Sequence, residues 1–255
     1  AARRAIGAVL ERRGRVDVLV NNAGIIVCGP LAHMTQEDFE EAMAVHFWGP
    51  LYLTRAVLPA MRDQGGGRIV NISSIGGLVA VPHLLPYCAS KFALTGFSDG
   101  LRAELAREGI RVTTVCPGLM RTGSHVNAWF RGQHAKEFSW FAVSNAFPLN
   151  SMSARRAARK IVRACRYGRA HLTLTLPARL LARADRLFPN LTAEVVQRVS
   201  RMLPAPDEEG GGERRRGWES TSPLAPSLLT RLSDRQVVRN NERLPRLGRR
   251  ETFRS

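Results

Sequence analysis

The sequence predicts an α/β protein with a doubly wound parallel sheet. Short apolar runs rich in β-branched residues alternate along the chain with longer helical segments, and this alternation is typical of βαβ units. Three of the runs stop at loops of small polar residues. Ligands bind outside the carboxyl ends of the strands in such sheets. We therefore expect a functional site at the edge where these loops meet.

The first third of the chain supplies one of these strands between two helices. We expect a helix over residues 3–13 and a buried strand over residues 16–21. The strand stops at Asn22-Ala23-Gly24, which is typical of a tight turn. A long helix is expected over residues 36–62, because Thr35 precedes it as an N-cap residue with an acidic residue three positions later.

The other elements follow in the same alternation. A strand over residues 68–73 delivers Ser74 at its carboxyl end, and a strand over residues 111–116 ends at Pro117-Gly118. The remaining predictions are a helix over 86–108, an irregular stretch over 118–152, a helix over 153–166, a strand over 171–176 and helices over 178–188 and 192–203.

Tyr87 and Lys91 are the residues that first suggest chemistry. They are four positions apart in the expected helix, so they share one face. An ammonium beside a phenol favours the phenolate and lowers the tyrosine pKa from its ordinary value of about 10. Such a tyrosine can exchange a proton with a substrate oxygen, and Ser74 can hydrogen-bond the same oxygen. A Tyr-x-x-x-Lys pair alone is also typical of a solvated helix face.

Taken together and in this order, the motifs closely resemble those of the short-chain dehydrogenase/reductase family. They are Asn22-Ala23-Gly24, Ser74, Tyr87-x-x-x-Lys91 and Pro117-Gly118 with Thr122, and the resemblance covers roughly residues 1–200. It implies a Rossmann-like fold with NAD or NADP as cofactor. It also implies hydride transfer between nicotinamide and the carbonyl or secondary alcohol carbon of a small molecule.

The resemblance implies a role for each motif residue. Tyr87 would be the acid/base, Ser74 would position the substrate oxygen, and Lys91 would both tune Tyr87 and bind the nicotinamide ribose. The cofactor-binding residues implied in the same way are Asn22, Ala23, Gly24, Tyr87, Lys91, Pro117, Gly118, Met120 and Thr122. The family also implies that helices 36–62 and 86–108 pair across a two-fold axis, so we expect a homodimer or homotetramer.

The sequence departs from the family pattern at its start. Family members open with a strand and a Thr-Gly-x-x-x-Gly-x-Gly turn, whose glycines let the backbone approach the pyrophosphate. Neither feature is present here. We expect an N-terminally incomplete member of the family that lacks its first strands and its glycine-rich turn. The alternative is a shortened natural protein that binds no dinucleotide.

His46 is the second departure. It stands where the family usually has an asparagine that holds a water in the proton relay from the active-site lysine. A histidine can both donate and accept, so His46 is a candidate catalytic residue. A helix histidine that packs near Trp48 is the alternative.

The stretch from Gly123 to Ser153 is expected to cover the catalytic edge and to set specificity. Its aromatic residues are Trp129, Phe130, Phe138, Trp140, Phe141 and Phe147. We call this stretch the lid. Its aromatic residues either form an apolar cover over a hydrophobic substrate or pack the lid on the body of the protein. His83 is close to Tyr87 in sequence, but we expect it to be a surface loop residue.

Composition bounds the organisation of the chain. With 255 residues, 44% of them hydrophobic, residues 1–203 can form one domain. Residues 204–255 are polar and rich in Pro, Gly, Ser, Glu and Arg, so we expect a disordered tail. The sequence has no apolar run of about 18 residues and no signal-peptide pattern. Four cysteines without a C-x-x-C pair indicate reduced thiols in a cytoplasmic protein and no metal site.

The formal net charge of +17 raises the question of a polyanionic partner. Of 38 basic residues 35 are arginine, which indicates a codon bias rather than a nucleic-acid patch, so we expect no nucleic-acid partner. Residues 151–203 carry 12 basic and 2 acidic residues, a net charge of +10. We expect a solvated basic surface there, with peripheral contact to an anionic membrane as an addition.

Two other functions remain open. A chain without the phosphate turn and the relay asparagine is what a decayed enzyme would look like. Such a non-catalytic remnant would act as a binding or scaffold protein through its basic surface. Isomerases or dehydratases of sugar nucleotides share the Tyr-x-x-x-Lys pair, but these relatives are longer.

Overall fold

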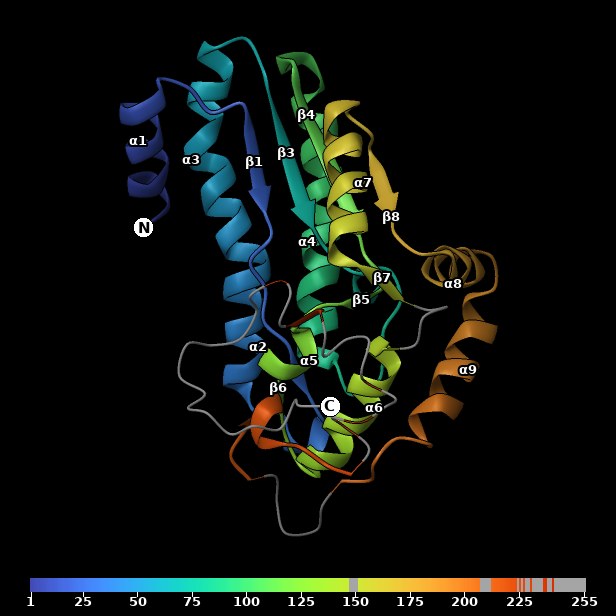
Figure 1. Ribbon diagram of the computed structural model, residues 1–255. Helices are drawn as coiled ribbons and strands as arrows, with labels where there is room; N and C mark the ends of the chain where they lie inside the picture. Colours follow the sequence, from blue (N-terminus) through green and yellow to red (C-terminus); the bar gives the residue numbers. More distant parts are fainter. Residues whose placement is uncertain are drawn as a thin grey trace.

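A four-stranded parallel sheet forms the centre of the molecule (Figure 1). The computed structural model describes residues 1–146, 151–206 and 212–223, with residues 225, 227, 230, 236, 237 and 240. The strand order is β1-β3-β4-β8, and every neighbouring pair is parallel. The strands are β1 (Val18–Asn21), β3 (Gly67–Ile72), β4 (Ile110–Cys116) and β8 (His171–Thr173).

Helices cover both faces of this sheet because neighbouring strand residues point to opposite sides. Val70 and Val115 pack in one buried cluster with residues of α7 (Ala154–Arg166). Ile69 and Val112 belong to a second cluster with α1 (Ala2–Arg13) and α3 (Gly49–Asp63). The doubly wound parallel arrangement expected from the sequence is therefore confirmed.

Helix α4 (Leu85–Glu104) is tied to the sheet by buried polar groups as well as by packing. Ser98 accepts hydrogen bonds from Asn71 Nδ2 at 3.0 Å and from Thr114 Oγ1 at 2.8 Å. These bonds satisfy polar atoms of β3 and β4 that lie away from solvent. They fix the position of α4 against the two central strands.

The expected helix over residues 36–62 is interrupted. It consists of α2 (Gln36–Met43), a π-helical turn (Ala44–Trp48) and α3. The predicted cap is present, with Thr35 and Asp38 in a reciprocal capping box. Pro50 has no N–H to donate to the carbonyl of His46, so the regular hydrogen-bond pattern cannot continue there. The strand expected over 171–176 is also shorter, because α8 (Leu176–Leu187) begins earlier than expected.

The expectation of an irregular stretch over residues 118–152 is wrong. The described part contains β5 (Leu119–Arg121), α5 (Ser124–Asn127), β6 (Trp129–Phe130), α6 (His134–Ala146) and β7 (Ser151–Ser153). Strand β5 pairs with β7, and β6 pairs with β2 (Val27–Cys28). Strands of two or three residues are too short to show a sequence period. Phe147, one of the six aromatic residues, lies outside the described residues.

The described part of the C-terminal region differs from the disordered tail that its composition predicts. Strand β9 (Arg215–Arg216) pairs antiparallel with β6. The Arg216 guanidinium lies 3.5 Å from the ring centroid of Trp129 and donates to the Asn127 carbonyl at 2.7 Å. Ala225 is fully buried in the apolar cluster of the lid. A cation on an indole face and a short ladder therefore hold this polar segment.

No helix in the described part of the chain is long and apolar enough to cross a bilayer.

Replacing Val20 by lysine should reduce aggregation of the isolated chain. Among the described strands β1 pairs only with β3, and Val18 and Val20 are 43% and 51% exposed. An apolar edge strand is a template for pairing with another chain, and a lysine blocks this. We expect a lower rate of light-scattering growth at equal concentration and a stability change within about 0.5 kcal/mol. Leu31→Lys, at an exposed residue outside the sheet, is the control and should not slow aggregation.

Candidate active site

Ser74 and Tyr87 meet where β3 ends and α4 begins. Ser74 caps a 3-10 turn (Ile75–Gly77), and its Oγ accepts the Gly76 N–H at 3.0 Å. Ser74 is near enough to Tyr87 for its hydroxyl to lower the pKa of the phenol by hydrogen bonding. A Cβ on Gly76 would lie 3.3 Å from the Tyr87 ring and 3.5 Å from Ser74 Oγ, so glycine lets the ring come close to the turn. Two of the residues that the sequence singles out thus lie side by side.

Lys91 completes the group from the next turn of α4. Its ammonium is buried, donates to the Ile72 carbonyl at 2.8 Å and lies 5.6 Å from the centroid of the Tyr87 ring. The Ser73 hydroxyl donates to the Lys91 carbonyl at 3.0 Å. Main-chain and side-chain groups of Lys91 therefore both bind the end of β3.

The expected lowering of the Tyr87 pKa by Lys91 is not found. Burial raises the pKa of Tyr87 to about 12, and the hydrogen bond with Ser74 opposes this shift. Burial also lowers the pKa of Lys91 to about 8. The reason is that desolvation disfavours the charged form of each group. The ammonium is directed to a backbone carbonyl rather than to the phenol. Tyr87 is thus a neutral phenol at neutral pH.

The turn after β1 lies beside Lys91. Asn22, Ala23 and Gly24 are exposed, and a Cβ on Gly24 would lie 3.8 Å from Lys91 Nζ. Asn21, which the sequence reasoning missed, is the buried member of the pair. Its Nδ2 donates to Asn71 Oδ1 at 2.7 Å, whereas its Oδ1 is buried with no hydrogen-bond partner among the described residues. The sequence pattern that could have identified Asn21 is the alternation of side chains along the strand, because successive residues point to opposite faces and Asn21 points inward.

The loop after β4 reaches the same edge. The Ile75 N–H donates to the Pro117 carbonyl at 2.7 Å, which joins this loop to the turn after Ser74. A Cβ on Gly118 would overlap Thr175 and Ala178, so this glycine lets the loop pack against the start of α8.

Met120 and Thr122, the last two expected cofactor residues, are partly buried. Met120 packs against the apolar cluster under α7. The Thr122 hydroxyl lies 2.7 Å from that of Ser124. The structure therefore brings the strand-end loops to one edge, but these two side chains have partners within the protein.

His46 is fully buried in the π-helical turn, and the geometry supports a structural role for it. Nε2 accepts the Ile25 N–H at 3.1 Å, so we assign the ring proton to Nδ1, which lies 2.7 Å from Ser90 Oγ. The ring meets Tyr87 edge to face with centroids 5.3 Å apart. Burial and the Lys91 charge lower the pKa of His46 to about 3. Both nitrogens are engaged, so the ring clamps the turn that follows β1.

A buried carboxylate joins the lid to the loop before Tyr87. Glu137 of α6 is fully buried, and its oxygens lie 2.7 Å from His83 Nδ1 and accept from Trp140 Nε1 at 2.6 Å. The expectation that His83 is a surface residue is therefore wrong. Cys28 Sγ donates to the same carboxylate at 3.6 Å. The partners come from β2, α6 and the loop before α4, which are distant in sequence.

The aromatic residues of the lid are mostly core residues. Phe130, Phe138 and Phe141 are buried in one cluster, and Tyr87 and Trp140 pack against it. These contacts support the alternative in which the aromatics pack the lid on the body. The partly buried residues at the border of this cluster are Tyr87 and Trp140, together with Ile26 and Val81.

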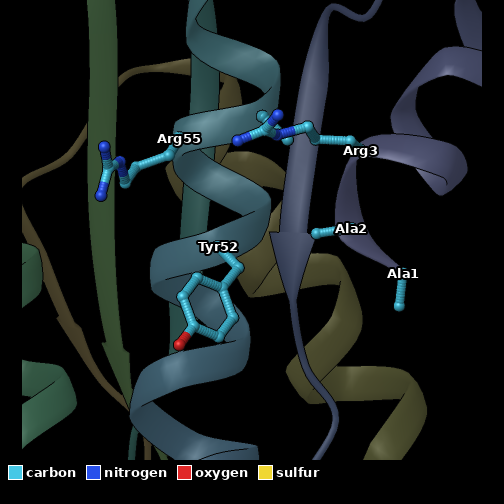
Figure 2. Close-up of a pocket in the computed structure, with 6 residues that line it drawn as sticks. Ala1, Ala2, Arg3, Tyr52 and Arg55 are labelled. Atoms are coloured by element: carbon cyan, nitrogen blue, oxygen red, sulfur yellow. The ribbon is translucent and has the colours of Figure 1, made fainter.

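Two further observations concern possible sites away from Tyr87. A surface pocket of about 750 Å³ lies between α1 and α3, where Figure 2 shows Ala1, Ala2 and Arg3 beside Tyr52 and Arg55. It includes none of the residues that surround Tyr87. Within the described residues no group of three or more His, Cys, Asp or Glu is placed to hold a metal ion.

Replacing His46 by glutamine should reduce the acid sensitivity of the fold. The pKa of His46 is about 3 in the protein and 6.5 ordinarily, so unfolding takes up a proton between these values. The contribution of neutral His46 to the free energy of unfolding is fully present above the ordinary pKa and is lost as the pH falls towards the pKa in the folded protein. This histidine should account for about 2 kcal/mol between about pH 7.5 and about pH 5. Urea unfolding of both proteins at both pH values measures the difference. Parallel losses would contradict the prediction.

Replacing Glu137 by leucine should destabilise the protein by about 3–5 kcal/mol, because His83 and Trp140 would lose their buried acceptor. Glu137→Gln keeps one carbonyl oxygen and should cost less. Denaturant unfolding measures both. Glu104→Leu, at an exposed residue on α4, is the control and should change stability by less than about 0.5 kcal/mol. Equal effects of Glu137→Leu and the control would exclude a structural role for the carboxylate.

Comparison with known proteins agrees with this geometry. The family model described as short chain dehydrogenase matches residues 1–130. The chain is 43% identical over 117 residues to an uncharacterized oxidoreductase of Thermotoga maritima, which is 46% of this chain and 47% of that protein. The chain spans about half the length of the curated relatives it matches.

Solved structures are similar over a larger part of the chain. A short-chain dehydrogenase from Streptomyces avermitilis is 34% identical with a TM-score of 0.65, over 79% of this chain and 76% of that one. A gluconate 5-dehydrogenase from Burkholderia cenocepacia, in complex with NADP and tartrate, is 27% identical with a TM-score of 0.57, over 68% and 69%. The family model matches just over half of the residues, and the chain belongs to the short-chain dehydrogenase/reductase family.

Proposed function

We propose that the protein is an NAD(P)-dependent oxidoreductase that transfers a hydride between nicotinamide and a carbonyl or secondary alcohol carbon. The observation that carries the proposal is the contact of Ser74 with Tyr87 beside the buried Lys91 ammonium. A phenol, a hydroxyl and an ammonium at the carboxyl edge of a parallel sheet provide a proton donor and a group that orients its acceptor.

The residues present fit the nicotinamide end of such a cofactor. An ammonium has three donors, and Lys91 has one acceptor among the described residues, Ile72 O. Two donors therefore remain for ribose hydroxyls, next to the exposed turn at Gly24. The pyrophosphate would need a glycine-rich turn at a helix N-terminus, which the described residues do not supply. NAD and NADP both fit what is present.

The site can supply the proton that reduction of a carbonyl requires. When bound, the reduced cofactor supplies the hydride to the carbonyl carbon. Tyr87, whose pKa is about 12, holds its proton at neutral pH and donates it to the carbonyl oxygen, which gives the alcohol. Ser74 donates a hydrogen bond to the same oxygen and orients it. His46 acts as a positioning residue, because it holds the turn beside Lys91.

The surroundings of Tyr87 support an apolar substrate. Leu84, Phe141 and Trp140 belong to, or pack against, the cluster that Tyr87 borders. A small molecule with a hydrophobic body and one carbonyl or hydroxyl group fits such a wall. Four free cysteines support a reducing, cytoplasmic compartment.

Self-association of the enzyme through α3 and the neighbouring helix α4 is part of the proposal. Trp48 and Tyr52 stack, and both are about half exposed, as is Phe92 of α4. Exposed aromatic residues on two adjacent helices are typical of an interface. We propose a homodimer or homotetramer built on this face.

Replacing Tyr87 by phenylalanine should abolish turnover and leave cofactor affinity nearly unchanged, because only the proton donor is lost. The protein expressed from its complete reading frame is assayed with NADH and NADPH against a panel of apolar ketones. Loss of kcat of at least about 10²-fold with cofactor binding retained is expected. Tyr167→Phe, at the exposed C-terminal end of α7 and outside the site, is the matched control and should keep wild-type activity. Unchanged turnover of the Tyr87 variant would refute the assignment.

A catalytically silent wild type would favour the rival function, a non-catalytic remnant with a binding or scaffold role. The assembled site argues against this alternative, because a decayed enzyme has no reason to keep a buried ammonium beside a phenol.

A further inference from the structure

Helices α8 (Leu176–Leu187) and α9 (Pro189–Ser200) have their large apolar side chains on the outside. The residues that α8 turns inward are Ala178, Ala182 and Asp185, and in α9 the one buried residue is Thr192. The two helices pack against each other. They lie beyond the β8 edge of the sheet, on the side away from β1 (Figure 1). Their inner faces are therefore small or polar, which is the reverse of an ordinary surface helix.

The exposed side chains form one stripe on each helix. Those that are between 38% and 84% exposed are Leu176, Leu180, Leu181, Leu187, Phe188, Leu191, Val195, Val199 and Met202. At 3.6 residues per turn, Leu176, Leu180 and Leu187 fall on one side of α8. Leu191, Val195 and Val199 fall on one side of α9, and Phe188 joins the two helices. Leu181, one residue after Leu180, lies about 100° further round α8. We call the other eight residues the apolar stripe.

Arginines border the apolar stripe on both helices. Arg179, Arg183 and Arg186 occupy the adjoining side of α8 and are exposed. Arg198 and Arg201 have the same relation to the stripe of α9. The one exposed acidic residue of the two helices, Glu194, lies 3.6 Å from Arg198. Arginines therefore border the stripe on each of the two helices.

Helix α7 adds charge beside this pair. Its exposed or partly exposed basic residues are Arg155, Arg156, Arg159, Lys160, Arg163 and Arg166. The whole segment of residues 151–203 has 12 basic and 2 acidic residues, a net charge of +10. The field around the apolar stripe is thus strongly positive.

We propose that α8 and α9 form a docking surface for an anionic lipid membrane. The apolar stripe enters the boundary between headgroups and acyl chains, and the arginines bind the lipid phosphates and carboxylates around it. No described helix can cross a bilayer, so the contact is peripheral. This surface is separate from the site at Tyr87 and does not depend on the proposed function.

Charge complementarity selects this partner over the others. A second copy of the chain would bring two arginine-bordered stripes together and repel itself. A nucleic acid would bind the arginines but leave the leucines, valines and Met202 in water. An anionic lipid surface is the partner that satisfies both parts.

Sedimentation of the full chain with vesicles tests the proposal. The vesicles contain phosphatidylcholine alone or with about 30 mol % phosphatidylserine. We expect binding to the anionic vesicles at least about tenfold stronger than to the neutral ones, and weaker binding at high salt. Two triple variants separate the apolar contribution to binding from the electrostatic one. The stripe variant combines Leu180→Gln, Leu187→Gln and Leu191→Gln. The arginine variant combines Arg179→Gln, Arg183→Gln and Arg186→Gln.

Each variant has a matched control. Leu31→Gln removes an exposed leucine elsewhere, and Arg4→Gln with Arg12→Gln and Arg13→Gln removes three exposed arginines of α1. We expect the stripe and arginine variants to lose at least about tenfold in affinity and the controls to bind like the wild type. Circular dichroism melts verify that every variant is folded, and all replaced residues are exposed.

Four outcomes would overturn the proposal. The first is equal binding to neutral and anionic vesicles, and the second is wild-type binding by both sets of variants. The third is the absence of vesicle binding together with a dimer in light scattering that the leucine replacements dissociate, which would assign the stripe to a second copy. Loss of binding by the α1 control as well would reduce the effect to net charge and would equally reject a defined surface.

Discussion

The hydrogen bond from the Lys91 ammonium to the Ile72 carbonyl fixes the geometry on which the site depends. A buried charge is tolerated only where polar groups meet it, so α4 has to begin at the end of β3. Ser73, whose hydroxyl binds the Lys91 carbonyl, holds the same two elements from the other side. Because these two elements are joined, Ser74 at the strand end lies close to Tyr87, which is one turn before Lys91. The arrangement of the catalytic group is thus set by the need to satisfy one ammonium.

Burial, rather than the attraction between neighbours, sets the charges around Tyr87. The pKa of Tyr87 is raised while those of Lys91 and His46 are lowered, and desolvation is the largest cause in each case. The rule that residues four positions apart share a helix face identifies which groups can touch, but it does not say how deeply each group is buried. For this reason the sequence could predict Lys91 beside Tyr87 and still give the wrong sign for its effect on the phenol. The folded arrangement keeps the site neutral at the tyrosine and at the histidine.

The sequence predicts the sheet well because its signals are local. β-branched runs mark β1, β3 and β4, and each strand places its final residues at the same edge. The lid could not be predicted in this way. Strands β5, β6 and β7 are two or three residues long and depend on partners far along the chain. The hydrogen bond between His83 and Glu137 spans 54 residues, and neither residue has a local pattern that points to the other. Asn21 was missed because the motif drew attention to Asn22, its exposed neighbour.

The pairing of β6 with β9 has a consequence for the order of folding during synthesis. All four strands of the central sheet have been synthesised once residue 173 is made. Trp129 and Phe130 of the lid, by contrast, pair with Arg216 and Arg215, which are translated 87 and 85 residues later. Chains fold as their segments emerge, so the nascent protein passes through a stage with a formed sheet and an open lid. A chaperone that recognises unburied aromatic rings would meet the polypeptide at that stage.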